Sequence, residues 1–281
     1  MHIGMAIEYA CVFGISSEVQ NLNPGEQVAS LNDGRSFLTF PGKGGRVFWF
    51  LLVKLDRKYP YASAPRFTTE DAQEMGERYA NDHIWKGVRF GDIWNHRLFF
   101  GATNLEENVF QTWHSGRVVC IGDSIHKMAP NTGQGANCAI EDAGALANFL
   151  HQAIVSDGTL CNHEMDSLLK AFTQTRIQRI RQIYKSARLV VRLHARHNLF
   201  LRLIGRYYLP YSGDLPADTA SRMIAGAVSL NFLPLPQRSG PGWELFSRER
   251  GSVKLYFGLV LASTFLLSML FWRKDMIPHY A

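Results

Sequence analysis

The chain has 281 residues, of which 46% are hydrophobic, 12% are aromatic and 19% are charged. This composition predicts a folded protein with a sizeable core, and it excludes a disordered chain, a fibrous protein and a small disulfide-stapled domain. The net charge of +6 has a local origin, because nine Lys or Arg and no acidic residue lie between Arg176 and Arg206. A single basic segment argues against nucleic-acid binding and favours contact with a membrane or with an anion.

The four cysteines, Cys11, Cys120, Cys138 and Cys161, show neither CxxC spacing nor a high density. We expect them to be reduced thiols in a reducing compartment. Residues 1–14 carry an acidic residue in the middle and no basic head, so no secretory signal peptide is expected.

Residues 37–40 and 46–55 are β-rich runs that flank the sequence PGKGG, so they are predicted to form a hairpin with a five-residue turn. Both faces of the second run are apolar. This predicts a sheet that is covered on both sides, or a sheet with one face that lines a pocket for an apolar ligand. Further along, Thr69–Arg78 should form a helix with Thr69 as its N-cap and acidic residues in its first turn.

Residues 117–123 (RVVCIGD) are predicted to form a short buried strand that ends on Gly122 and Asp123. Open α/β sheets bind ligands at the carboxyl ends of their strands. A carboxylate there accepts hydrogen bonds from hydroxyl groups, such as those of a ribose or ribityl chain. The glycine before it lets a ligand approach the backbone, so we expect a polar ligand at this strand end.

A second ligand-binding feature follows a loop that contains Pro130. The sequence Gly133-Gln134-Gly135 leads into a predicted helix whose stripe of mostly small residues permits close packing on a sheet. No acidic residue precedes Glu141 in this helix. Its free backbone N–H groups and the positive end of its dipole are therefore expected to bind an anion or an electron-rich ring oxygen.

The C-terminal half of the chain is predicted to be helical and to end at a membrane. Residues 164–194 form a long predicted helix whose basic face is either solvated or attracted to anionic lipid. The apolar segment 223–235 is too short to span a bilayer, so it should either lie in the interface or pack internally. Residues 253–272 carry a single charge, Lys254, and are predicted to form a transmembrane helix. We therefore expect a single-pass C-terminal anchor in the endoplasmic reticulum membrane, with a cytosolic body.

The segment 118–150 resembles the second FAD-binding motif of the flavoprotein monooxygenases related to aromatic hydroxylases. In that family a Gly-Asp strand end is followed by a loop with His and Pro, then by Gly-x-Gly and a helix with Glu-Asp-Ala. The matching residues are Gly122, Asp123, His126, Pro130, Gly133, Gln134, Gly135, Glu141, Asp142 and Ala143. The passages EYACVFGIS and SFLTFPGKGGRVFWFLLVKL, with the apolar tail, are similar to fungal FAD-dependent monooxygenases of meroterpenoid and indole-diterpene biosynthesis.

This resemblance implies FAD as the cofactor. Asp123 would bind its ribityl–pyrophosphate region, residues 133–137 would hold the pyrophosphate or the pyrimidine edge of the flavin, and Pro130 would lie beside the isoalloxazine ring. The expected cofactor-binding residues are Gly122, Asp123, Pro130, Gly133, Gln134, Gly135, Ala136 and Asn137. Tyr9 is the candidate catalytic residue if its hydroxyl reaches a substrate pocket; otherwise it is a core tyrosine. No metal site is expected, because His194 and His197 have no nearby acids in the sequence.

The implied function is an FAD-dependent monooxygenase that uses NAD(P)H and O₂. Its substrate would be a lipophilic prenylated aromatic or indole compound of fungal terpenoid secondary metabolism, epoxidised on its polyprenyl chain. The family's strand–GxGxxG–helix unit and its Gly-Ala-Asp-Gly motif do not occur in the sequence. The alternatives are therefore a truncated non-catalytic remnant or membrane-anchored interaction subunit, and an aromatic-ring hydroxylase.

The expected fold class is α/β (α+β): the C-terminal part of an FAD-binding flavoprotein monooxygenase fold with a mixed substrate-domain sheet, followed by the transmembrane helix. The predicted divisions are a substrate-domain sheet with helices at 1–112, the second half of the FAD-binding domain at 113–160, a long basic helix and C-terminal helical region at 161–236, a linker at 237–252 and the transmembrane helix at 253–272.

Overall fold

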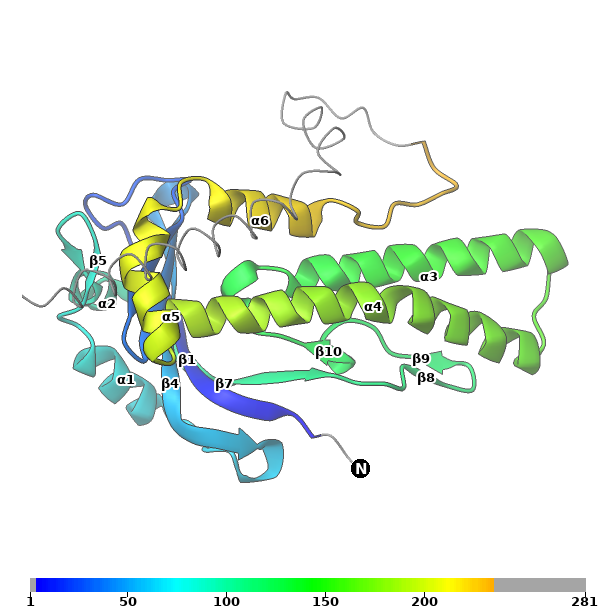
Figure 1. Ribbon diagram of the computed structural model, residues 1–281, viewed down its shortest axis with the longest axis horizontal. Helices are drawn as coiled ribbons and strands as arrows, with labels where there is room; N and C mark the ends of the chain where they lie inside the picture. The colour runs from blue at the N-terminus through cyan, green and yellow to red at the C-terminus, as the bar shows by residue number, and fades with distance from the viewer. Residues whose placement is uncertain (1–3, 235–281) are drawn as a thin grey trace, which may run out of the picture. The chain divides into compact units, whose positions relative to one another are not determined.

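A computed structural model describes residues 4–234 of the chain (Figure 1). A six-stranded sheet with the strand order β10-β7-β1-β4-β3-β2 forms its centre. Its strands are β1 (Ala6–Ser16), β2 (Val28–Asn32), β3 (Arg35–Pro41), β4 (Val47–Pro60), β7 (Arg97–Val109) and β10 (His126–Lys127). The short strands β5 (His83–Trp85) with β6 (Val88–Arg89), and β8 (His114–Ser115) with β9 (Val118–Val119), form two separate pairs. The helices are α1 (Thr69–Arg78), α2 (Phe90–Asn95), α3 (Gly135–Asp157), α4 (Asn162–His194), α5 (Leu199–Leu203) and α6 (Leu215–Ile224).

Every strand pair of the central sheet is antiparallel, so the predicted mixed sheet is wrong. Short turns join β2 to β3 and β3 to β4, and such turns can connect only antiparallel neighbours. The predicted hairpin is confirmed: β3 pairs with β4 from Arg35 opposite Val53 to Pro41 opposite Val47.

Helices α1 and α2 cover one face of the sheet. Trp49 of β4 is buried there, with its ring in edge contact with Phe90 and Trp94 of α2 at centroid distances of 5.3 and 5.7 Å. The predicted helix Thr69–Arg78 is confirmed as α1, but its N-cap is Thr68, whose side chain accepts from the Asp71 N–H. These aromatic contacts hold the sheet-facing side of α2 in place.

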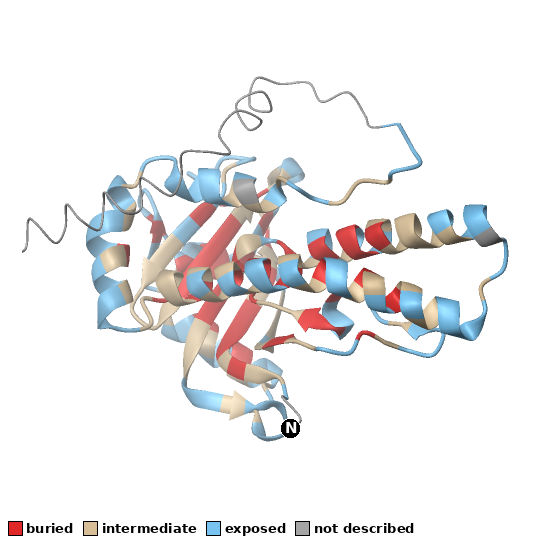
Figure 2. Ribbon diagram, turned by 45° about the vertical axis from the view of Figure 1, so that its right-hand side comes forward, coloured by how far each residue is buried: buried red, intermediate tan, exposed pale blue. Residues whose placement is uncertain are grey.

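The C-terminal half of α4 covers the opposite face (Figures 1 and 2). The predicted helix 164–194 is confirmed within α4. Val191 of α4 and its C-cap residue Ala195 pack against buried Tyr9, Cys11 and Leu52 of the sheet. The prediction of a sheet covered on both faces is thereby confirmed.

Strand β1 contains a bulge at Glu8 relative to β7, because Ile7 pairs with Glu106 and Tyr9 with Leu105. The register against β4 shifts at the same point, but there the extra residues, 55–58, belong to β4. Neighbouring residues of a regular strand point to opposite faces. Here Glu8 and Tyr9 both contact Arg192 of α4: Glu8 Oε2 lies 2.7 Å from its Nη2, and the Tyr9 ring centroid lies 5.7 Å from its guanidinium carbon. The bulge therefore brings two consecutive residues to one helix.

The chain after α6 returns along α3. The Asn148 side chain donates to the Ser229 carbonyl at 2.8 Å, and the Phe232 ring stacks on His151 with a centroid distance of 4.2 Å. Of the two alternatives for the segment 223–235, the described residues up to 234 favour internal packing.

The predicted localisation at a membrane is contradicted. Among residues 4–234, no helix has the length and apolar character needed to cross a bilayer. The predicted linker 237–252 and transmembrane helix 253–272 lie outside the described residues.

Candidate functional site

The Gly-Asp turn does not follow a buried strand. Strand β9 has two residues and pairs with β8 as a hairpin, and Val118 is 69% exposed. The predicted buried strand 117–123 is therefore wrong, because no other strand among the described residues pairs with it. The turn itself is a single 3₁₀ turn, Gly122–Ser124.

Gly122 is required at this turn for two reasons. Its φ of +66° lies in the left-handed region that favours glycine. A Cβ placed on Gly122 would also lie 3.0 Å from the Cβ of Ala139 on α3. The turn thus packs directly on the helix that follows.

The loop Pro130–Thr132 and the left-handed Gly133 (φ +63°) lead into α3, which begins at Gly135 as predicted. No side chain caps this helix end and no acidic residue lies in its first turn. Ala136 and Asn137 are exposed, and the Asn137 side chain donates back to the Gly133 carbonyl at 3.1 Å. The first N–H groups of α3 are therefore available to an anion.

Asp123 lies beside this helix start with a free carboxylate. The residue is exposed, and it makes no hydrogen bond or ion pair with any described residue. Its Oδ1 would lie 3.8 Å from a Cβ built on Gly135, which places the carboxylate next to the open end of α3. The structure thus brings together acceptors for hydroxyl groups and donors for an anion.

Two polar atoms in the loop are buried without partners: Asn131 Oδ1 and Thr132 Oγ1. The Asn131 amide nitrogen lies 3.1 Å from His194 Nδ1, and burial lowers the pKa of His194 to about 4, so this imidazole accepts the bond in its neutral form. A buried polar atom without a partner is costly, so the two orphaned oxygens favour a ligand that donates to this loop.

A buried carboxylate that the sequence analysis did not assign fixes the Gly-Asp turn. Asp142 of α3 is fully buried and accepts the Gly122 N–H at 3.0 Å through Oδ2. His126 Nε2 lies 2.6 Å from the same oxygen, and Arg176 Nε donates to Oδ1 at 2.8 Å. Asp142 therefore holds the backbone that carries Asp123.

Glu141 completes this network. Arg176 donates to it at 2.7 Å, and Arg179 donates to both of its oxygens at 2.7 Å. Burial raises the pKa of both acids, but the bonds from Arg179 and Arg176 outweigh it at Glu141, and those from His126 and the Gly122 N–H outweigh it at Asp142. Both acids therefore have a lowered pKa and remain ionised at neutral pH.

Much of the basic face predicted for α4 is paired with acids. Arg176 is 1% exposed. Arg192 lies 2.7 Å from Glu8 and 3.1 Å from Glu107, and Arg188 lies 3.5 Å from Glu8. For Arg176 and Arg192, whose side chains are 1% and 14% exposed, both predicted alternatives, a solvated face and a lipid-facing one, are wrong.

Tyr9 is 1% exposed, and its hydroxyl lies 2.6 Å from His197 Nδ1. Burial raises its pKa well above the usual value, against the opposing charge of Arg192. Tyr9 shares an apolar cluster with Ala129, the residue before Pro130. The structure thus places it behind the loop, in the core, with its hydroxyl engaged by a partner 188 residues away.

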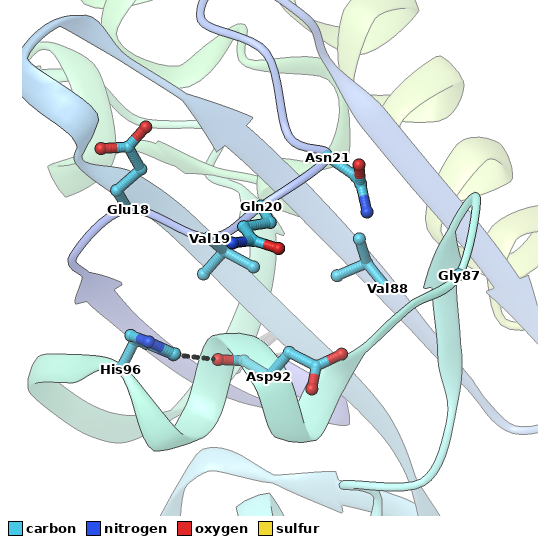
Figure 3. Close-up of a pocket in the computed structure, with 8 residues that line it drawn as sticks. All are labelled: Glu18, Val19, Gln20, Asn21, Gly87, Val88, Asp92 and His96. Carbon is cyan, nitrogen blue, oxygen red and sulfur yellow. Dashed lines mark hydrogen bonds between the residues drawn. The ribbon is translucent and has the colours of Figure 1, made fainter.

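A pocket of about 610 Å³ lies elsewhere, between the chain after β1 and helix α2 (Figure 3). Its polar lining comes from Glu18, Gln20, Asn21, Asp92 and His96. His96 Nδ1 lies 2.7 Å from the Asp92 carbonyl oxygen, so part of this lining serves the helix itself. None of the predicted cofactor-binding residues lines this pocket.

Two solved structures, one of them with FAD bound, share this fold. The structure of HpxO from Klebsiella pneumoniae with FAD and uric acid matches 77% of this chain and 52% of its own, with a TM-score of 0.57 and 19% identity. A salicylate hydroxylase substrate complex matches 80% of this chain and 58% of its own, with a TM-score of 0.53 and 17% identity. At these identities the likeness shows the fold alone.

The family model described as FAD binding domain matches residues 35–187, more than half of the chain. The chain belongs to this FAD-binding family, and the predicted cofactor, FAD, is confirmed.

Curated relatives confirm the predicted resemblance to fungal FAD-dependent monooxygenases. FAD-dependent monooxygenase cle3 of Aspergillus versicolor is 63% identical over 89% of this chain and 51% of its own length. FAD-dependent monooxygenase spyC of Aspergillus fumigatus is 58% identical over 95% of this chain and 57% of its own length. The chain spans about half the length of the curated relatives it matches.

The loop fits FAD. The buried, unpartnered oxygens of Asn131 and Thr132, the open N-terminus of α3 and the exposed Asp123 carboxylate supply acceptors and donors within residues 123–137. FAD presents hydroxyl groups, a pyrophosphate and ring N–H groups, which match these three features in kind.

Proposed function

We propose that this chain contributes to an FAD-dependent monooxygenase that uses NAD(P)H and O₂ as co-substrates. The free Asp123 carboxylate beside the uncapped start of α3 carries this proposal. Identity of 63% to a protein named as such a monooxygenase supports the activity. When bound, reduced FAD supplies the activation of O₂ that transfers one oxygen atom to a substrate and releases the other as water.

Within this proposal, residues 113–160 act as the second half of the FAD-binding domain. The Asp123 carboxylate accepts hydrogen bonds from the ribityl hydroxyl groups. The N–H groups of Gly135, Ala136 and Asn137 bind the pyrophosphate or the pyrimidine edge of the flavin. Gly122, Gly133 and Gln134 shape the turn and the helix start, and Pro130 lies beside the ring system. Asp142 positions this turn by accepting the Gly122 N–H.

For Tyr9 we propose a supporting role on the substrate side. Its buried hydroxyl and His197 form a hydrogen-bonded pair behind the loop, where they help to exclude water from the reacting centre.

The proposed reaction is epoxidation of a polyprenyl chain on an aromatic or indole nucleus, in fungal terpenoid secondary metabolism. Support comes from several fungal relatives named FAD-dependent monooxygenases, with identities of 43–63%. The fold shared with a salicylate hydroxylase keeps ring hydroxylation as the second candidate. Mass spectrometry of the product distinguishes them, because an epoxide opens to a diol in acid and a phenol does not.

The binding experiment is a titration of the chain with FAD, followed by flavin fluorescence. Asp123→Asn should weaken FAD binding by about tenfold or more, because a hydrogen bond to a charged group is worth about 1.5–3 kcal/mol. The matched control is Asp214→Asn, since Asp214 is also exposed and its side chain makes no cap bond.

Equal FAD affinity in the Asp123 variant and the wild type would show that the ligand is misplaced. A wild-type chain that binds no FAD at all would favour the alternative of a non-catalytic interaction subunit.

A further inference from the structure

The last three arginines of the basic segment, Arg196, Arg202 and Arg206, gather around one carboxylate. Asp33, in the turn between β2 and β3, has Arg196 Nη1 at 3.6 Å from Oδ1. Its Oδ2 lies 3.3 Å from Arg202 Nε and 3.9 Å from Arg206 Nη2. Three positive charges thus face a single negative charge.

These guanidinium groups have many unused donors. Each arginine carries five N–H donors, yet the side chains of Arg196, Arg202 and Arg206 donate no hydrogen bond to any described residue. Arg196 Nε and Asp33 Oδ1 are buried atoms without a hydrogen-bond partner. Arginines of α4 such as Arg176, by contrast, make several bonds of 2.7–3.3 Å.

Among residues 4–234, Asp33 is the only acid that forms an ion pair with Arg196, Arg202 or Arg206. The neighbouring Arg35 is engaged in an ion pair with Asp82, and Lys54 donates to the His197 carbonyl at 3.1 Å, which adds another positive charge. Arg202 and Arg206 are about half exposed, with 46% and 51% of their side-chain surface open. An anion from solution can therefore reach the cluster, and its binding would relieve the repulsion between like charges.

The backbone holds this cluster in place. The Gly34 N–H donates to the Ala195 carbonyl at 2.8 Å, which ties the turn carrying Asp33 to the end of α4. Arg196 has a left-handed φ of +45°, and Arg206 lies in a single π-helical turn, Ile204–Tyr208. Both are unusual conformations that recur at functional sites.

We propose that Arg196, Arg202 and Arg206 form a binding site for the phosphate monoester of a nucleotide. The planar guanidinium fork matches phosphate oxygens. A phosphate dianion can accept hydrogen bonds from all three guanidinium groups, whose donors the single Asp33 carboxylate leaves mostly unused. The same segment carries exposed aromatic rings that can stack on a base, at Phe200, Tyr207 and Tyr211. The site stands independently of the proposed flavin chemistry, although NADPH, with its adenosine 2′-phosphate, is a nucleotide of this class.

The test is isothermal titration of the full chain with adenosine 2′,5′-bisphosphate. The double variant Arg202→Gln/Arg206→Gln should lose affinity by about 100-fold, about tenfold for each arginine. The control Arg46→Gln/Arg66→Gln removes the same charge from two exposed arginines elsewhere and should bind as the wild type does. Equal losses in both double variants, or no binding by the wild type, would overturn the proposal.

Two further measurements sharpen the test. Asp33→Asn removes the competing carboxylate and should raise affinity severalfold; a loss of affinity with an unchanged fold would contradict the proposed geometry. Binding to vesicles that contain phosphatidate, with none to the soluble nucleotide, would also overturn it. FAD titration of the Arg202→Gln/Arg206→Gln variant should match the wild type, so failure at this site is distinguishable from failure of the flavin proposal.

Discussion

The two ends of the basic segment put the same residue type to opposite uses. At its start, Arg176 is buried and shares Asp142 and Glu141 with His126 and Arg179. At its end, Arg196 and its two neighbours surround a single half-exposed aspartate. The first set is saturated by its own chain, and the second is not.

This difference shows that a run of arginines in the sequence does not define one surface. A buried guanidinium group is tolerated only when acids satisfy most of its donors, so the first set is part of the core. The second set keeps its donors open to solvent, where a ligand can use them. Substitutions in the first set should therefore change folding stability, and substitutions in the second set should change ligand binding.

The largest expected effect is a loss of folding stability when the buried network around Arg176 is broken. Arg176→Met should lower the free energy of unfolding by about 3–5 kcal/mol, because it leaves Asp142 and Glu141 buried with fewer partners. Urea unfolding followed by far-UV circular dichroism measures this loss. Arg66→Met, at an exposed residue, is the matched control and should change stability by less than about 0.5 kcal/mol. Similar losses of stability in both variants would show that Arg176 supports the fold no more than an exposed arginine does.

Acid should weaken the network around Arg176. The pKa values of Asp142 and Glu141 are lowered in the folded chain, so their stabilisation is present above the unfolded values of about 3.9 and 4.3. It is lost as the pH falls below about 4 and through the folded-state values. The stability difference between the wild type and Arg176→Met should therefore shrink as urea titrations move from pH 7 towards pH 3. A difference that stays constant with pH would mean that these carboxylates do not titrate with the network.

The smallest expected effect concerns the second set. Arg202→Gln and Arg206→Gln should each change the free energy of unfolding by less than about 0.5 kcal/mol, because exposed ion pairs contribute little. Thermal unfolding at low and high salt measures this. A marked loss in either variant would show that the open cluster also supports the fold.

Local patterns predicted the elements that depend on local physics. The capping residues before α1, the alternation along β4 and the glycines before α3 each determine conformation within a few residues, and all three elements are present. The position of Asp123 beside the start of α3 also followed from local order in the sequence.

Other features depend on distant partners and were missed for that reason. Arg176 pairs with Asp142 and Glu141, which lie 34 and 35 residues away in the sequence. Its spacing along the helix therefore could not distinguish a buried arginine from one on a solvated face. Residues 117–123 have the composition of a buried strand, but burial requires a neighbouring strand, and among the described residues β9 has only β8. The Glu141-Asp142-Ala143 motif was the sequence feature that pointed to the buried network.

The bulge at Glu8 also changes what strand β1 can tolerate. From Tyr9 onward, alternate residues of β1 face α4, so a residue gained or lost there would exchange the two faces. At Glu8 the pairing is already out of step with both neighbours, and one residue more or less can be absorbed without that exchange. Length variation among relatives of this strand should therefore be found at Glu8, or at the second register shift against β7 between Ile15 and Ser16, rather than between them.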